Sequence, residues 1–231
     1  MKKNLLALAF LVGLLTCCKS EDAPIKPVKP TDPGSINKEY MSRAETTFAN
    51  IFKYYWSDKV RMMFGSYPNT LGTPQEPSSP DYDSHAYLWG LGSVVSAFNA
   101  IVQNTDNVDF RMTYESRLKE TLLKYYNTTK EPMCFGCFVN PHDQRLYDDA
   151  IWVGIDLADL YSKTKDSWYL DYAKSVWNFV LSGKDDELGG GVYWDENAKD
   201  SKNTCSNAPA VVLALKLYQI TNDAAYLENG K

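Results

Sequence analysis

Two adjacent aspartates, Asp148 and Asp149, are the residues whose type and spacing best suit chemistry. Cleavage of a glycosidic bond needs two carboxyl groups, because one attacks C1 or activates water while the other protonates the leaving oxygen. Neighbouring residues of a helix diverge by about 100°, so the two tips could lie roughly 5–8 Å apart, which overlaps the spacing of about 5–5.5 Å in retaining enzymes. This range does not separate retention from inversion. The alternative without catalysis is that Asp148 caps a helix and Asp149 is a first-turn charge.

Six segments have the apolar periodicity of helices, and a seventh begins near the end of the chain. They are residues 39–56, 84–103, 109–126, 148–163, 168–181 and 206–220. The second, fourth and sixth are apolar on nearly all sides and must be covered, whereas the others have one apolar face. The chain is therefore expected to alternate outer and inner helices.

A repeat supports this alternation. The pattern LYxxTxDxxYL at residues 160–170 recurs at residues 217–227, about 57 residues later. Repeated helical hairpins with buried inner members predict an α/α toroid. The alternative is ordinary helix pairs that share a turn sequence.

Three long loops lead into the N-termini of the inner helices: residues 57–83, 129–147 and 183–205. Long irregular loops in a compact domain are usually functional. Parallel inner helices would place all three loops on one rim, together with the paired aspartates. The turns after the inner helices are tight by comparison.

Three stretches stand out at the predicted rim: YDDAIW at residues 147–152, DDELGGGVYW at 185–194 and KNTCSNAPA at 202–210. They resemble the motifs of glycoside hydrolase family 76, the bacterial endo-α-1,6-mannanases. Their order and spacing match the family from about Glu39 to the C-terminus. Together they are far more specific than two adjacent aspartates alone.

The resemblance implies an all-α fold, an (α/α)6 toroid, and endo-acting hydrolysis of α-1,6-linked mannan with retention. Asp148 is then the nucleophile and Asp149 the acid/base. Six hairpins of the repeat seen here would need roughly 340 residues, so we expect a truncated toroid with about seven of its twelve helices. Two other hypotheses are a non-catalytic glycan-binding lipoprotein on the same scaffold and a different (α/α)6 enzyme, such as an inverting hydrolase or a sugar epimerase.

Rim position suggests further residues that contact the substrate. They are Tyr193, Trp194, Asn203, Asn207 and His85. Tyr and Trp rings stack on the flat faces of sugars. The alternative is that these residues only build loops and helix caps.

Cys134 and Cys137 have the spacing of a metal or redox pair, but a structural zinc would need two more ligands. His142 and Cys205 could supply them, although nothing in the sequence places them together. A local disulfide or two free thiols is the expected state in an exported protein. The acids at residues 185–187 lack the regular spacing of a calcium loop, and we expect neither a metal nor a cofactor.

The first 18 residues predict a lipoprotein signal peptide. Lys2 and Lys3 precede a short apolar run, and the sequence after it resembles a lipobox, whose cysteine is lipidated. Cys18 fits this position best, with cleavage before Cys17 or simple secretion as alternatives. We expect an exported lipoprotein at the outer membrane or cell surface.

Residues 19–37 contain four prolines and predict a tether that is neither helix nor strand. Residues 38–231 would form one catalytic domain, since 231 residues with 44% hydrophobic content can bury one sizeable core. The net charge of −5 argues against nucleic acid or an anionic membrane surface as a partner. We expect a monomer whose partner is a polysaccharide and which meets the membrane only through its lipid.

Overall fold

The computed structural model describes residues 33–68, 85–139 and 144–230, with side chains from residue 37 onward. The helical domain described here comprises the residues from Glu39 onward. The first helix, α2, begins before this boundary. The helices are α2 Pro33–Tyr55, α3 Leu88–Asn104, α4 Val108–Tyr125, α5 Tyr147–Thr164, α6 Ser167–Ser182, α7 Thr204–Thr221 and α8 Ala225–Asn229. No helix within the described ranges is both long and apolar enough to cross a bilayer.

The strands are two short hairpins in the loops between helices. Strand β1 (Trp56–Ser57) pairs antiparallel with β2 (Met62–Met63). Strand β3 (Tyr126–Asn127) pairs antiparallel with β4 (Cys134–Phe135). The prediction of an all-α fold built from helical hairpins is confirmed.

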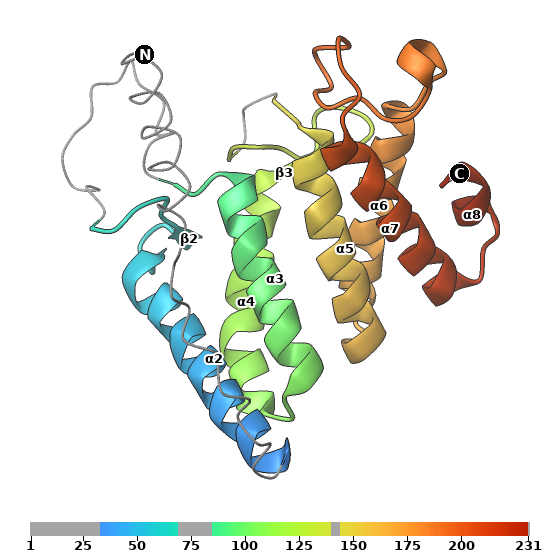
Figure 1. The fold of residues 1–231 in the computed structure, drawn as a ribbon. Helices are drawn as coiled ribbons and strands as arrows, with labels where there is room; N and C mark the ends of the chain where they lie inside the picture. Colours follow the sequence, from blue (N-terminus) through green and yellow to red (C-terminus); the bar gives the residue numbers. More distant parts are fainter. Residues whose placement is uncertain (1–32, 69–84, 140–143, 231) are drawn as a thin grey trace, which may run out of the picture. The chain divides into compact units, whose positions relative to one another are not determined.

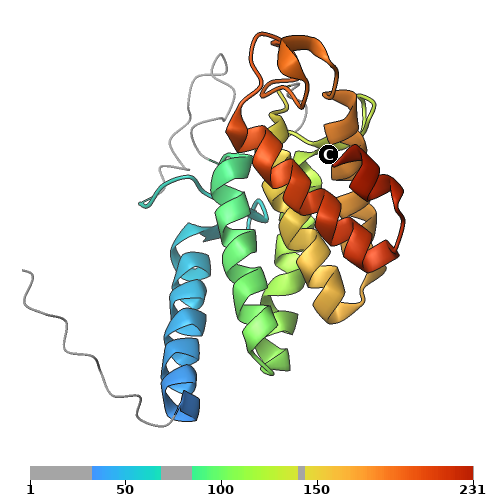
Figure 2. The same ribbon diagram turned by 45° about the vertical axis from the view of Figure 1, so that its right-hand side comes forward.

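Helices α3, α5 and α7 lie side by side, and α4 and α6 pack behind them (Figure 1; Figure 2). Helix α5 is central because it contacts α3, α6 and α7, and 12 of its 18 residues are buried. Gly154 permits this close packing, since a Cβ there would lie 2.9 Å from Val176 Cγ1 and 3.1 Å from Leu213 Cδ2. The predicted alternation of inner and outer helices is confirmed.

The outer helices use a single apolar face. Phe48 of α2 lies 5.3 Å from Phe110 and 5.1 Å from Tyr114 of α4, measured between ring centroids. Its ring also lies 6.0 Å from that of Phe98 on the inner helix α3. These ring contacts pack α2 and α4 against the inner helix α3.

The sequence repeat produces the same turn twice. Thr164 and Thr221 end inner helices, and each hydroxyl donates to the carbonyl four residues earlier at 2.7 Å. The next residue in each case is left-handed, with φ of 61° and 57°. Asp166 and Asp223 then each accept a hydrogen bond at 3.0 Å from the backbone N–H two residues on. The predicted periodicity is therefore a repeat of structure.

The long loops lie at the opposite end of the helices from these turns (Figure 1). Backbone hydrogen bonds join them where they enter the inner helices. Leu88 N donates to Cys137 O at 2.9 Å, and Tyr147 N donates to Trp194 O at 3.0 Å. The described parts of the three loops thus form one rim, as predicted, while residues 69–84 and 140–143 are outside the described ranges.

Helix α3 begins later than the predicted residue 84. Phe64 and His85 form an antiparallel bridge, and Ala86 N donates to Met63 O at 3.0 Å. Because the residues just before α3 pair with the β1–β2 hairpin, they are extended, and the helix starts at Leu88.

Helix α2 begins earlier than predicted, at Pro33. This proline lies inside the segment predicted as a tether. Proline is compatible with the first turn of a helix, where an N–H would have no partner. The expectation that Pro33 excludes a helix was therefore wrong, whereas residues 19–32 are not described and the tether stays a prediction there.

Candidate active site

Asp148 and Asp149 both lie in the first turn of α5, and each is 9% exposed. The cap position is held by Leu146, whose side chain makes no capping hydrogen bond. The interpretation of Asp148 as the N-cap was therefore wrong. Its Oδ1 instead accepts a hydrogen bond from the backbone N–H of Asp149 at 3.0 Å. The helix N-terminus favours negative charge at this place.

Trp194 reaches Asp148 from the loop between α6 and α7. Its indole Nε1 donates to Asp148 Oδ2 at 3.2 Å. The thiol of Cys205, in the first turn of α7, contacts the same carboxylate; its pKa is raised by burial first and then by Asp148. Helix α5, the loop and α7 thus converge on Asp148, and each of its oxygens accepts an N–H donor.

Asp149 has a different environment. It lines a cavity of about 720 Å³, together with the neighbouring Cys137. Burial raises the pKa of Asp149 to about 6, the negative charge of Asp148 adds to the rise, and a hydrogen bond with Cys137 opposes it. The two adjacent acids therefore differ in their surroundings: Asp148 accepts two N–H hydrogen bonds, whereas the raised pKa of Asp149 lets it retain its proton nearer to neutral pH.

The cavity beside Asp149 has mostly apolar walls that contain several aromatic side chains. They include Tyr55, Tyr87, Trp89 and Phe138. Trp89 is 56% exposed. A second hollow of about 320 Å³ is also lined by Trp89 and Asp149 and extends to Trp152. Flat, partly exposed rings next to a carboxyl group are surfaces on which sugar rings can stack.

Two of the predicted substrate residues support the loop. Tyr193 is 3% exposed, its hydroxyl donates to Asp185 Oδ1 at 3.1 Å, and Lys202 lies over its ring. Asn207 accepts from Val192 N at 2.7 Å and donates to Val192 O at 2.9 Å. The polar atoms of both side chains are therefore hydrogen-bonded within the loop.

The other predicted rim residues differ in position. Asn203 holds the cap position of α7, makes no side-chain capping bond, and is exposed. His85 lies beside the cavity, with its ring stacked 6.1 Å from that of Phe64. Trp194 is thus the predicted substrate residue that the structure brings against Asp148.

Cys134, Cys137 and Cys205 are free thiols. Burial raises the pKa of both Cys134 and Cys137 to about 12. Within the described residues, no three His, Cys, Asp or Glu side chains gather as a metal site requires; His142 is not among them. The acid Asp185, considered for calcium, forms an ion pair with Lys202 at 2.5 Å.

Asp156 is a buried acid that was not predicted from the sequence. It lies two turns further along α5, is 7% exposed, and accepts hydrogen bonds from the Ser96 hydroxyl and from Asn99 Nδ2. Burial raises its pKa to about 6. An acid on a helix that is apolar on nearly all sides is expected to be buried, so the apolar pattern of residues 148–163 was enough to predict the burial of Asp156.

An ion pair between the buried Arg145 and the half-buried Glu196 was also not predicted from the sequence. Arg145 is 0% exposed and lies three residues before the first aspartate. No local pattern marks this pair, since its members are 51 residues apart in sequence.

The sequence matches a model of glycosyl hydrolase family 76 over residues 39–231. The chain belongs to this family. No curated protein matched the sequence. The described helices form part of the (α/α)6 toroid of family 76, with the paired aspartates at its rim.

Several family 76 structures are similar to this chain. A family 76 glycoside hydrolase from a bovine Bacteroides thetaiotaomicron strain is 30% identical with a TM-score of 0.69, and the match covers 83% of this chain and 40% of that one. A family 76 mannosidase from Bacteroides thetaiotaomicron VPI-5482 is 25% identical with a TM-score of 0.69, covering 82% and 51%. This chain therefore spans about half or less of the length of these proteins.

A third similar structure contains a ligand. It is an inactive variant of the α-1,6-mannanase of Salegentibacter sp. HEL1_6, in which two consecutive aspartates are replaced by alanine, in complex with α-1,6-mannotetrose. It is 22% identical with a TM-score of 0.60, and the match covers 83% of this chain and 48% of that one. At this identity the likeness shows the shared fold.

Proposed function

We propose that this protein carries out endo-acting hydrolysis of α-1,6-linked mannan with retention of configuration. Asp148 is the nucleophile and Asp149 the acid/base. The observation that carries the proposal is the unequal environment of two adjacent acids. Asp148 accepts N–H donors on both oxygens, while the pKa of Asp149 is raised to about 6.

In the proposed first step, a carboxylate oxygen of Asp148 attacks C1 of a mannosyl residue and the bond to the leaving sugar breaks. Asp149 gives its proton to the departing oxygen, which needs an acid still protonated near the working pH. In the second step, the Asp149 carboxylate takes a proton from water while the water oxygen attacks C1. The bond from C1 to Asp148 then breaks, and the free carboxylate is restored.

The substrate class is supported by the relatives. The Salegentibacter α-1,6-mannanase is inactive without its two consecutive aspartates and was solved with α-1,6-mannotetrose. Asp148 and Asp149 are consecutive aspartates within the matched region of this chain. The aromatic side chains in the cavity walls around Asp149 suit the stacking of several sugar rings.

The test is the release of oligosaccharides from linear α-1,6-mannan by the full-length gene product and its variants. Asp149→Asn should lower the rate about a hundredfold to ten-thousandfold, the usual contribution of a general acid. Asp148→Asn should abolish the reaction. Asp156→Asn is the matched control, because it is the same substitution on the same helix and leaves both proposed catalytic groups in place.

Two further measurements refine the result. The anomeric proton of the first product, followed by NMR, should show the α configuration if the reaction retains. With an aryl mannoside whose good leaving group needs little acid assistance, azide should restore the rate of Asp149→Ala and form an α-mannosyl azide, because it replaces water in the second step. Undiminished release by both asparagine variants would reject the assignment, and binding of mannan without cleavage by the wild type would favour a glycan-binding role.

We also propose that the protein is anchored at the outer membrane or cell surface by a lipid on Cys18. The support is the signal-like sequence before Cys18, which is not among the described residues. Labelling of cells with radioactive palmitate should mark the wild type and Cys17→Ala but not Cys18→Ala. Loss of label in Cys17→Ala alone would contradict this assignment.

A further inference from the structure

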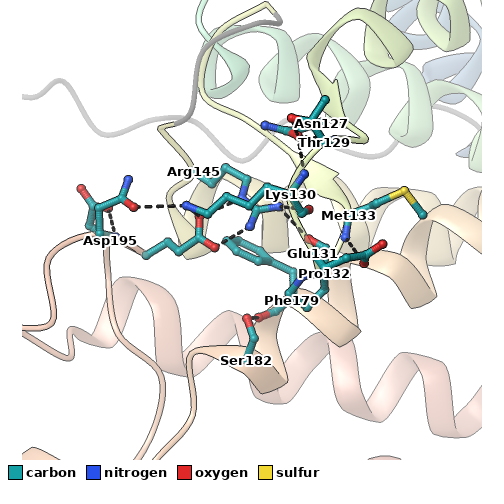
Figure 3. A network of polar contacts seen from close by, with 12 residues as sticks. Asn127, Thr129, Lys130, Glu131, Pro132, Met133, Arg145, Phe179, Ser182 and Asp195 are labelled. Carbon is teal, nitrogen blue, oxygen red and sulfur yellow. Dashed lines mark hydrogen bonds and ion pairs between the residues drawn. The ribbon is translucent and has the colours of Figure 1, made fainter.

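A largely buried ion pair joins the segments that carry Asp148 and Trp194. Arg145 Nε donates to Glu196 Oε2 at 2.8 Å, and its Nη2 donates to the other carboxylate oxygen. Arg145 Nη1 donates to the carbonyls of Lys130 at 3.2 Å and Pro132 at 2.6 Å (Figure 3). The guanidinium is therefore held by partners from two loops.

The remaining surfaces of the pair are also covered. The Arg145 guanidinium carbon lies 4.7 Å from the centre of the Phe179 ring on α6, and Lys130 Nζ lies 3.0 Å from Glu196 Oε2. Burial alone would raise the pKa of Glu196, but hydrogen bonds to Arg145 and Lys130 outweigh it and lower the pKa. Glu196 is therefore ionised, and its contact with Arg145 is charged and bidentate.

Backbone pairing continues from this ion pair toward α5. Glu196 N donates to Arg145 O at 3.3 Å, Leu146 and Asp195 form an antiparallel bridge, and Tyr147 N donates to Trp194 O at 3.0 Å. A buried ion pair adds little net stability compared with apolar side chains. The pair joins the same two segments as the backbone bonds do, so it can hold their register.

The Trp194 side chain depends on that register. Its residue is 37% exposed, so packing does not enclose the indole. The contact of Nε1 with Asp148 Oδ2, at 3.2 Å, is its specific polar contact with α5. A shift of the loop backbone would move the donor away from the carboxylate.

We infer that Glu196 and Arg145 are positioning residues, whose ion pair holds the Trp194 indole against Asp148. The effect on rate rests on the proposed function, whereas the contact itself does not. Loss of one hydrogen bond to a charged group should lower kcat about tenfold to a hundredfold. KM should change little, because neither residue lines the cavity or the second hollow.

The first test needs no substrate. The sequence has six tryptophans, and the Trp194 Nε1–H signal in a ¹⁵N-labelled full chain is the one lost in Trp194→Phe. It should shift in Asp148→Asn. It should shift and exchange faster with solvent in Glu196→Gln and Arg145→Lys, each of which breaks the bidentate contact while keeping a polar side chain.

The matched control is Glu120→Gln. Glu120 also binds an arginine through two nitrogens, with Arg61 Nη2 at 2.6 Å and Nε at 2.9 Å, but it lies on the outer helix α4. This variant should leave the Trp194 signal in place. A folded Glu196→Gln protein with an unmoved Trp194 signal would overturn the inference.

The second test is a double-mutant cycle in kcat on α-1,6-mannan. If Glu196 acts through Trp194, the double variant Trp194→Phe/Glu196→Gln should be as slow as Trp194→Phe alone. Losses that multiply would mean that Glu196 acts by another route and would reject the inference. Absence of cleavage by the wild type would reject the proposed function, and the NMR test would still decide the positioning role.

Discussion

Asn207 fills the space where a side chain on Gly191 would lie. A Cβ on Gly191 would be 2.3 Å from Asn207 Oδ1, the same oxygen that accepts from Val192 N. The asparagine side chain therefore pairs with the loop backbone as a neighbouring strand would. This contact ties the glycine run to α7, three residues before Trp194.

Replacement of Gly191 by alanine should destabilise the protein more than the same change at Gly189. Both glycines have φ of 89°, so alanine is strained at either place. Around Gly189 nothing lies within 4 Å of the new Cβ, so Gly189→Ala should cost roughly 1 kcal/mol of the free energy of unfolding. Gly191→Ala adds the clash with Asn207, for a total of about 2–4 kcal/mol. Urea denaturation of both variants measures the difference, and equal losses would contradict the Asn207 contact.

The rate of mannan hydrolysis should fall as pH rises above about 6. The pKa of Asp149 is raised to about 6 by burial and by Asp148, so the acid loses its proton in this range. The decline belongs to the coupled pair of carboxyl groups. An aryl mannoside with a good leaving group needs little acid assistance and should show a weaker decline. Profiles of kcat/KM against pH for the two substrates test this, and identical profiles would count against Asp149 as the acid.

Asp149→Asn should stabilise the protein at neutral pH. The pKa of Asp149 is raised from 3.8 to about 6 in the folded state, so the folded protein binds this proton more tightly than the unfolded chain. The contribution of the Asp149 proton to the free energy of unfolding is fully present below the pKa of the unfolded chain, 3.8, and is lost as pH rises through about 6. The gain in Asp149→Asn should be up to about 3 kcal/mol above pH 7 and should shrink toward pH 4.

Asp156→Asn is the companion measurement. Its pKa is also raised to about 6 by burial, and an amide can still bond with Ser96 and Asn99. Thermal unfolding of the wild type and both variants at several pH values gives the comparison. If the stability gained by either asparagine variant increased as the pH was lowered, the pKa of that aspartate would be lowered in the folded state and not raised.

Iodoacetamide should modify Cys205 before the other two described thiols. Cys205 is exposed, whereas Cys134 and Cys137 are buried with pKa values of about 12, and only the thiolate reacts. Because Cys205 contacts Asp148, activity should fall in step with its modification. Peptide mass spectrometry follows the label, and Cys205→Ala should resist inactivation whatever its starting rate. Earlier labelling of Cys137 would contradict the described burial.

The helices, their alternation and their repeated turns were predictable because their signals are local. Apolar periodicity along 148–163 identifies a buried helix without knowledge of its partners. The Thr164 turn uses only residues within a few positions of it, so its recurrence at Thr221 carries the same geometry. The start of α3 could not be predicted from local sequence, because Met63 of β2 and the adjacent Phe64 hold the residues before the helix extended.

The paired aspartates and their place at the start of a buried helix were determined by the sequence alone. Only the tertiary structure decided that Trp194 donates to Asp148, that Arg145 pairs with Glu196, and that the pKa of Asp149 is raised to about 6. The physical reason is that burial and hydrogen bonding depend on what distant segments place around a group. Residue types and spacing name the two acids, but their surroundings make them different.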